Sequence, residues 1–205
     1  TNWSTSGTNP VIITATGTAT INTSVVESYL NTGTSVLVVG DQISVSNDIE
    51  KTAGGEATIT FRAAGDDISE EGRLLVYSNI TSSSGALNII CWSDYNNHNK
   101  GGVSIFSGNT INTNGGHLWC GGSETTQGST SWNGLTVGDG PSVGSDGNNF
   151  NALDFYDVDL NTEGGDVFLW AAQGFSAGTN GLAFNGTTGE INSGTGDVIL
   201  VSDAF

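Results

Sequence analysis

The chain has 205 residues, and its 21 acidic residues against 4 basic ones give a formal net charge of −17. A charge of this sign repels nucleic-acid backbones and anionic lipid surfaces, so we expect no nucleic acid among the partners. No stretch comes near the roughly 20 apolar residues that a membrane helix needs, and membrane insertion is not expected either.

Strand-like runs begin with Val11-Ile12-Ile13, and from residue 30 onward one phrase recurs along the chain. The phrase is an apolar residue, then Asn, Thr or Ser, then Gly, and then alternating apolar residues. Its copies are LNTGTSVLV from Leu30, IEKTAGGEATITF from Ile49, ITSSSGALNII from Ile80, INTNGGHLWC from Ile111, LNTEGGDVFLW from Leu160 and INSGTGDVILV from Ile191. Such a recurrence indicates repeats that stack on one another.

The last glycine of each copy marks the length of the repeat. These glycines are Gly33, Gly55, Gly85, Gly116, Gly165 and Gly196, so their spacings are 22, 30, 31, 49 and 31 residues. The 49-residue interval includes a segment rich in Gly, Ser, Asn and Asp, residues 123–151. We interpret this segment as a loop excursion or a degenerate coil, and the sequence leaves both alternatives open.

Even-numbered positions after the glycines from Gly55 onward are apolar, which places them on one face of a strand. The predicted inward residues are Ala57, Ile59, Phe61, Leu87, Ile89, Cys91, Leu118, Cys120, Val167, Leu169, Val198 and Leu200. Stacked coils of about 20–30 residues would align them into a continuous core. We therefore predict an all-β fold, a parallel β-helix (β-solenoid) that forms one elongated domain over residues 1–205. A β-sandwich is the competing fold, but it has no reason to repeat a phrase.

Between Ile21 and Gly122 the chain resembles the filamentous haemagglutinin-like repeat regions of large secreted bacterial exoproteins and adhesins. The resemblance is carried by INTSVVESYLNTGTSVLVVGD, IEKTAGGEATITFRAAGDDI, ITSSSGALNIICWSD, GGVSIFSGNTINTNGG and HLWCGG, with further copies in LNTEGGDVFLWAAQG and INSGTGDVILVSD. It implies a right-handed parallel β-helix, export from the cell, and a role in adhesion, surface layers or filaments. It supplies no catalytic motif, so we expect no catalytic residue and no enzyme activity.

The odd-numbered positions should face solvent, yet several of them in the later repeats are large and apolar. These residues are Trp92, Trp119, Phe168, Trp170, Ile199 and Val201. An exposed apolar row of this size indicates an interface, either between copies of the chain or with the sugar rings of a polysaccharide. Two other interpretations remain: the assignment of the two faces is shifted by one residue, or segment 123–151 folds over the row.

The ends of a solenoid carry unpaired strands unless something covers them. The C-terminal run 197–201 shows no evident cap, and Val11-Ile12-Ile13 offers a strand at the other end. Head-to-tail stacking of these ends would produce an open fibre, so we expect a homo-oligomer or a fibre.

Cys91 and Cys120 fall on inward positions of neighbouring repeats. A disulfide between them would suit an exported protein, and two buried free thiols are an equally good interpretation.

Calcium is the one cofactor that the sequence suggests, because clustered Asp residues offer oxygen ligands. The candidate ligands are Asp139, Asp146, Asp154, Asp157 and Asp159, although Asp also forms turns. The last three, or the pair Asp66-Asp67, could instead be paired carboxylates for glycoside hydrolysis.

Together these features predict a secreted structural protein at the cell surface or outside the cell, a subunit of a fibre, filament or surface layer. It would assemble through the solenoid ends and the outward aromatic row. The alternative is a carbohydrate-binding segment of a larger adhesin, which contacts cell-surface or matrix polysaccharide through the same aromatic residues. A more remote alternative is a polysaccharide-degrading β-helix enzyme.

Overall fold

The described part of the chain is almost entirely β-structure. A computed structural model describes residues 2–16, 20–65, 72–106, 108–144, 151–172 and 181–202. Within these ranges it contains many short strands and one short helix, α1 (Thr23–Leu30). Short runs rich in Val, Ile and Thr and bounded by Gly, Asn and Ser favour this outcome. The predicted all-β class is confirmed.

Most strands belong to three sheets. In spatial order the first sheet has eight strands, β1 (Trp3–Ser6), β2 (Val11–Ala15), β3 (Val36–Gly40), β6 (Ala57–Ala63), β9 (Leu87–Trp92), β12 (Leu118–Gly121), β17 (Val167–Ala171) and β20 (Val198–Ser202). The second sheet has five, β4 (Ile43–Val45), β7 (Gly72–Val76), β10 (Gly101–Ile105), β15 (Leu153–Tyr156) and β18 (Leu182–Asn185). The third sheet also has five, β5 (Ile49–Lys51), β8 (Ile80–Ser82), β11 (Thr110–Asn112), β16 (Asp159–Asn161) and β19 (Glu190–Asn192).

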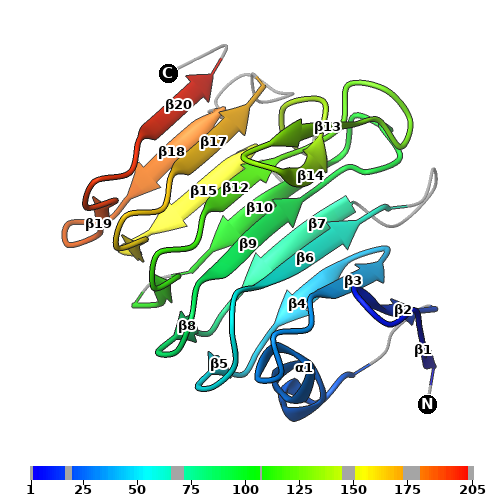
Figure 1. Cartoon of the computed structure of the whole chain (residues 1–205). Coiled ribbons are helices and arrows are strands. Elements are labelled where there is room, and N and C mark those ends of the chain that lie inside the picture. Colours follow the sequence, from blue (N-terminus) through cyan, green and yellow to red (C-terminus); the bar gives the residue numbers. More distant parts are fainter. Residues whose placement is uncertain are drawn as a thin grey trace.

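Each repeat contributes one strand to each of the three sheets, and each new strand lies parallel to the one before it. For example, β6, β7 and β8 are followed by β9, β10 and β11, which pair with them in that order. Only β1 pairs antiparallel within the three sheets as described, against β2. Figure 1 shows this repeat-like parallel architecture, with α1 and β1 at one end and β18, β19 and β20 at the other.

The core consists of inward side chains that stand in register from repeat to repeat. Ile59 pairs with Ile89, which pairs with Leu118, and the row continues to Val167. All four side chains are buried, as are Phe61, Cys91, Cys120 and Leu169 in the next row. The alternation after Gly55, Gly85, Gly116 and Gly165 therefore identified the inward face correctly, whereas after Gly33 the buried residues, Val36 and Val38, are one position later.

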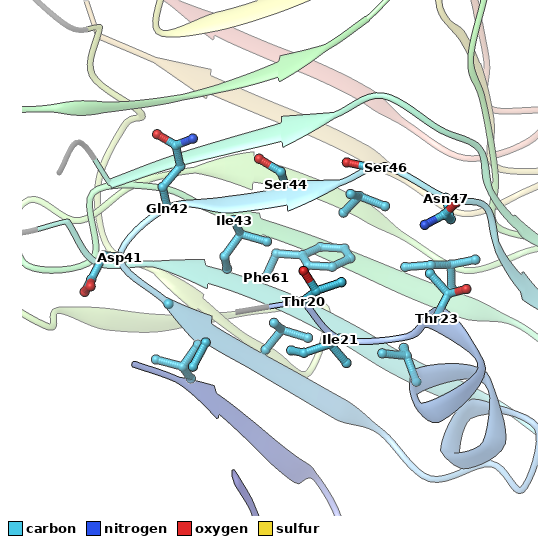
Figure 2. A pocket seen from close by; sticks show the side chains of 17 residues that line it. Thr20, Ile21, Thr23, Asp41, Gln42, Ile43, Ser44, Ser46, Asn47 and Phe61 are labelled. Atoms are coloured by element: carbon cyan, nitrogen blue, oxygen red, sulfur yellow. The ribbon is translucent and has the colours of Figure 1, made fainter. Parts of the chain in front are cut away.

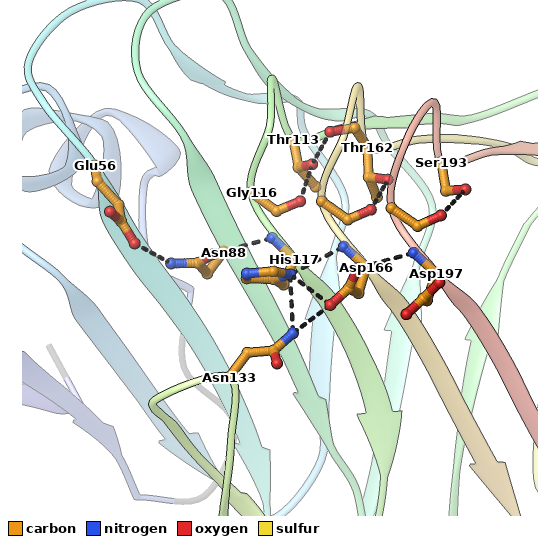
Figure 3. A network of polar contacts seen from close by, with 12 residues as sticks. Glu56, Asn88, Thr113, Gly116, His117, Asn133, Thr162, Asp166, Ser193 and Asp197 are labelled. Carbon is orange, nitrogen blue, oxygen red and sulfur yellow. Dashed lines mark hydrogen bonds and ion pairs between the residues drawn. The ribbon is translucent and has the colours of Figure 1, made fainter.

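The Ser or Thr and the last Gly of the repeat phrase form one turn in each of four repeats. Ser82 Oγ donates a hydrogen bond to the Gly85 carbonyl at 2.8 Å, and Ser193 Oγ donates to the Gly196 carbonyl at 2.7 Å. Thr113 and Thr162 make the same bond to Gly116 and Gly165, as Figure 3 shows. These bonds explain why the phrase recurs, because each one satisfies a carbonyl that the turn removes from the sheet.

Lys51 takes the place of this hydroxyl in the preceding repeat, since it pairs with Ser82. Its side chain is fully buried, and Nζ donates to the carbonyls of Ala53, at 3.1 Å, and of Ser84. Burial lowers the pKa of this ammonium group, and the carbonyl acceptors supply the polar contacts that water would otherwise make.

The long interval between Gly116 and Gly165 contains an antiparallel hairpin, β13 (Ser129–Trp132) and β14 (Leu135–Gly138). Its two-residue turn is Asn133-Gly134, and both residues have positive φ, 50° and 77°. This is the turn chemistry that joins tightly twisted strands. Since β12, β15 and β16 supply one strand to each sheet, the interval is a single repeat with a loop excursion.

Helix α1 covers the third sheet at the N-terminal end. Asn22 caps it by accepting the Ser24 N–H at 3.1 Å, and Val26 and Leu30 point into the core. Glu27 Oε1 accepts the N–H of Glu50, which lies on the edge strand β5, at 3.1 Å. The sequence analysis did not predict this helix.

Candidate assembly surface at the C-terminal end

The final strands β18, β19 and β20 are the terminal strands of the three sheets. Within the described ranges, each of them pairs on one side only, with β15, β16 and β17 respectively. A parallel strand directs alternate N–H and C=O groups to its two sides, so this end presents backbone groups that a further layer of strands can pair with.

The core rows continue into this end and remain uncovered there. Val198 pairs with Val167 and Leu200 pairs with Leu169. Val167 and Leu169 are 0% exposed, whereas Val198 and Leu200 are 42% and 41% exposed. Ile199 and Val201, on the other face of β20, are exposed as well. An apolar strand exposed on both faces and at its edge is the usual signature of an interface.

A cavity of about 350 Å³ opens between β18 and β19. Phe155 and Val158 are buried residues in its lining, and Phe184 and Ile191 lie in the last layer. Phe184 stacks on Phe155 with 5.2 Å between ring centroids, yet half of its surface is exposed. The other face of this ring is therefore available to a further layer.

A chain of side-chain acceptors also leads to this end. Asn88 Oδ1 accepts the His117 N–H at 2.9 Å, and His117 Nδ1 accepts the Asp166 N–H at 2.9 Å. Asp166 Oδ1 in turn accepts the Asp197 N–H at 2.8 Å, a bond that lowers the pKa of the Asp166 carboxyl group. Asp197 occupies the same position one repeat later and is exposed. Its carboxylate is placed to accept an N–H of the next layer.

At the N-terminal end the edges of the first and third sheets are covered, so the prediction of an open strand at Val11-Ile12-Ile13 is wrong. Strand β2 pairs with β3 on one side and with β1 on the other, and Val11 and Ile13 are buried. Over the third sheet, Asn31 Oδ1 accepts the N–H groups of Thr52 and Ala53 at 2.8 and 3.0 Å.

Most of the predicted outward aromatic row is covered. Trp92 and Trp119 are 3% and 1% exposed because the β13–β14 hairpin folds over them. Trp92 Nε1 donates to Ser123 Oγ at 2.9 Å, at the start of the excursion. Phe168 and Trp170 are half-buried, with Trp132 of the hairpin packed against Phe168. Only Ile199 and Val201 of the predicted row are exposed, and both belong to β20.

A second aromatic row, which the sequence analysis missed, follows the strands of the second sheet. Tyr77 stacks on Phe106 with ring centroids 4.3 Å apart and planes 7° apart, and Phe106 stacks on Tyr156 at 6.2 Å. Tyr77 and Tyr156 are exposed. The central ring, Phe106, is stacked between the other two, so this row stabilises neighbouring repeats.

Cys91 and Cys120 pair in register on β9 and β12, and both are buried and free in the structure. Burial raises the pKa of the Cys120 thiol, and the neighbouring Cys91 adds to the effect. The disulfide considered from the sequence is therefore not formed here, and both side chains fill the core as small apolar groups.

The predicted calcium ligands do not gather into a site. Asp139 accepts the Glu124 N–H and the Thr125 hydroxyl, both at 2.9 Å, within the excursion, whereas Asp157 accepts the Thr188 N–H at 2.8 Å in the last repeat. Asp159 is exposed on the third sheet, and Asp154 is buried, which raises its pKa. The described ranges hold no group of three or more acidic, His or Cys residues that could hold a metal. Asp146 and the pair Asp66-Asp67 lie outside these ranges.

Asp94 is the buried carboxyl group whose titration should affect stability most. It accepts the N–H groups of His98 and Asn99 at 2.9 and 3.1 Å, yet burial dominates and raises its pKa to about 6. The pKa of Asp94 is higher in the folded than in the unfolded state. Its contribution to the free energy of unfolding is therefore fully present below about pH 4 and is lost as the pH rises through 6. We expect the loss to approach about 3 kcal/mol at most. In urea unfolding, the free energy of unfolding should decrease less between pH 4 and pH 7 for Asp94→Asn than for the wild type. Equal decreases would contradict this assignment.

The described ranges contain no helix that is long and apolar enough to cross a membrane. The chain matches no protein-family model, no curated protein and no solved structure.

Proposed function

We propose that the chain is an extracellular structural module, built as a right-handed parallel β-helix, and that copies associate through its C-terminal end. The strand order supports the β-helix, since each repeat adds one parallel strand to each of the three sheets in turn. The right hand is the one that crossovers between parallel strands almost always take. The resemblance of the repeats to secreted exoproteins supports the extracellular role.

The contrast between the two ends is the observation that carries the proposal. The N-terminal end has β1, β2 and α1 over the first and third sheets of its outermost repeat, with Val26 and Leu30 packed against the core. The C-terminal end leaves Val198 and Leu200 about two-fifths exposed at the end of rows that are otherwise buried. Burial of such apolar surface is the main favourable term in association.

Head-to-tail stacking does not suit these ends. If β18 of one copy lay beside β4 of another, the first copy's β17 and β20 would fall where β2 and β3 of the second already lie. Between two copies of the 205-residue chain, the open end is therefore best covered by the same end of the second copy. Such a two-fold contact closes on itself and produces a dimeric rod with an N-terminal end on each side, not an open fibre.

Sedimentation equilibrium on the 205-residue chain tests the proposal. We expect a concentration-dependent dimer that is strengthened by salt, because salt screens the repulsion between two copies of charge −17. Leu200→Lys, which places a charge in the contact, should weaken the dimer at least about tenfold.

Thr130→Lys is the matched control, because it makes the same charge change at an exposed position of the hairpin. It should leave the dimer intact. A chain that stays monomeric at high concentration, or equal weakening by both variants, would refute association through this end. Open-ended polymers would refute the closed pair.

A further inference from the structure

A second apolar recess lies at the opposite end of the molecule, between α1 and the edge strand β4. Its volume is about 390 Å³, within the range of ligand-binding cavities. The lining includes the apolar residues Ile21, Val26, Ile43 and Phe61 and the exposed polar residues Thr20, Gln42 and Asn47. Figure 2 shows Ile21, Ile43 and Phe61 close together. This recess is not part of the C-terminal surface.

The edge strand β4 presents backbone hydrogen-bonding groups to the recess. Ile43 and Val45 point into the core, and the Val45 carbonyl accepts the Tyr77 N–H at 2.8 Å, next to the neighbouring strand β7. Because successive residues of a strand direct their N–H and C=O groups to opposite sides, those of Gln42, Ser44 and Ser46 point away from β7. All three residues are exposed and line the recess.

At this end, β4 differs from the edges of the other two sheets. Strand β3 is covered by β2, and β5 is covered by α1 through the bond from the Glu50 N–H to Glu27. Within the described residues β4 pairs with β7 alone. An added strand requires unpaired backbone N–H and C=O groups, alternating inward and outward side chains, and an apolar floor. Strand β4 and the recess beside it provide all three.

We propose that this recess binds an extended peptide segment that joins the second sheet as a strand beside β4. Alternate apolar side chains of the peptide enter the recess above Ile21 and Phe61, while its backbone pairs with Ser44 and its neighbours. The lining residues include Asp41 and no Lys or Arg, and the whole chain carries −17, so the segment is basic or neutral.

The probe is a fluorescein-labelled peptide with the sequence GRLLVY, which is the sequence of residues 72–77 and contains β7, the strand that already pairs with β4 on its other side. We expect saturable binding to the full chain by fluorescence anisotropy, and at least tenfold weaker binding of a scrambled peptide of equal charge. Equal binding of both peptides would overturn the proposal, because charge alone would then explain it.

Two variants at one position test the backbone contact. Ser44→Pro removes an N–H that points into the recess and should weaken binding at least tenfold, because proline is tolerated on an edge strand but cannot donate. Ser44→Ala keeps that N–H and should bind like the wild type. Equal binding by the two variants would contradict strand addition.

Hydrogen exchange of the wild-type chain gives an independent measurement if the proline variant does not fold. Saturating peptide should slow exchange of the amides of residues 42–46, and protection confined to other segments would refute the site. Leu200→Lys should bind the peptide normally, which separates this proposal from association through the C-terminal end.

Discussion

Replacing Gly165 by alanine is expected to lower the free energy of unfolding by about 3 kcal/mol. A Cβ atom at this position would lie 1.9 Å from the carbonyl oxygen of Gly116, in the same turn of the preceding repeat. The contact is between two backbones, so no side chain can rotate away, and the stacked turns would have to separate. Chemical denaturation followed by circular dichroism measures the loss.

Gly55→Ala is the matched control, because Gly55 is also the last glycine of a repeat phrase but its added Cβ would meet nothing within 4 Å. We expect this variant to be neutral or stabilised by up to about 1 kcal/mol, since alanine reduces the freedom of the unfolded chain. If both variants lost the same stability, the close approach of successive turns would not be the reason for glycine in the phrase.

Trp119→Ala should cost about 3–5 kcal/mol of folding stability and leave dimer formation of the folded protein unchanged. The ring is 1% exposed and packs with Ile90, Trp92 and Val137 under the hairpin. Its removal leaves a cavity between the first sheet and the hairpin that the short β13 and β14 strands cannot fill. Urea unfolding and sedimentation measure the two effects separately.

Phe184→Ala offers the opposite pattern, because half of that ring is exposed at the C-terminal end. It should cost little stability and weaken the dimer. Should Trp119→Ala instead keep full stability and lose only self-association, Trp119 would belong to an interface and the hairpin would not cover it.

The sequence was sufficient for the repeat and its inward face, because both depend on local regularities. The hydroxyl of Ser82 or Thr113 and the glycine three residues later recur as a turn, and the period of two after the glycine places Ile89 and Leu118 in the core. These features do not depend on what lies on the outer face of the first sheet. The prediction failed on that face, where the aromatic residues expected to be exposed are mostly covered.

The covering of Trp92 and Trp119 could not be read from their own strands, because it depends on a segment that folds back onto them. A signal for that segment was present: Asn133-Gly134, between Trp132 and Leu135, is a strong two-residue hairpin sequence. Helix α1 was harder to predict, since Val25 and Val26 favour strands and eight residues are marginal for a helix. Its contacts from Glu27 and Asn31 to the edge of the third sheet, far along the chain, stabilise it.

The hydrogen bonds accepted by Asn88, His117 and Asp166 all run in the same direction along the molecule, from each repeat to the next. Each of these side chains accepts an N–H from the repeat that follows it, so one acceptor in each of these repeats is completed by the next repeat. The first thirty or so residues supply a covered layer on which the next repeat can stack, which favours ordering of the repeats from the N-terminus toward the C-terminus. A chain that emerges from a ribosome or an export channel N-terminus first would present its folding information in that same order.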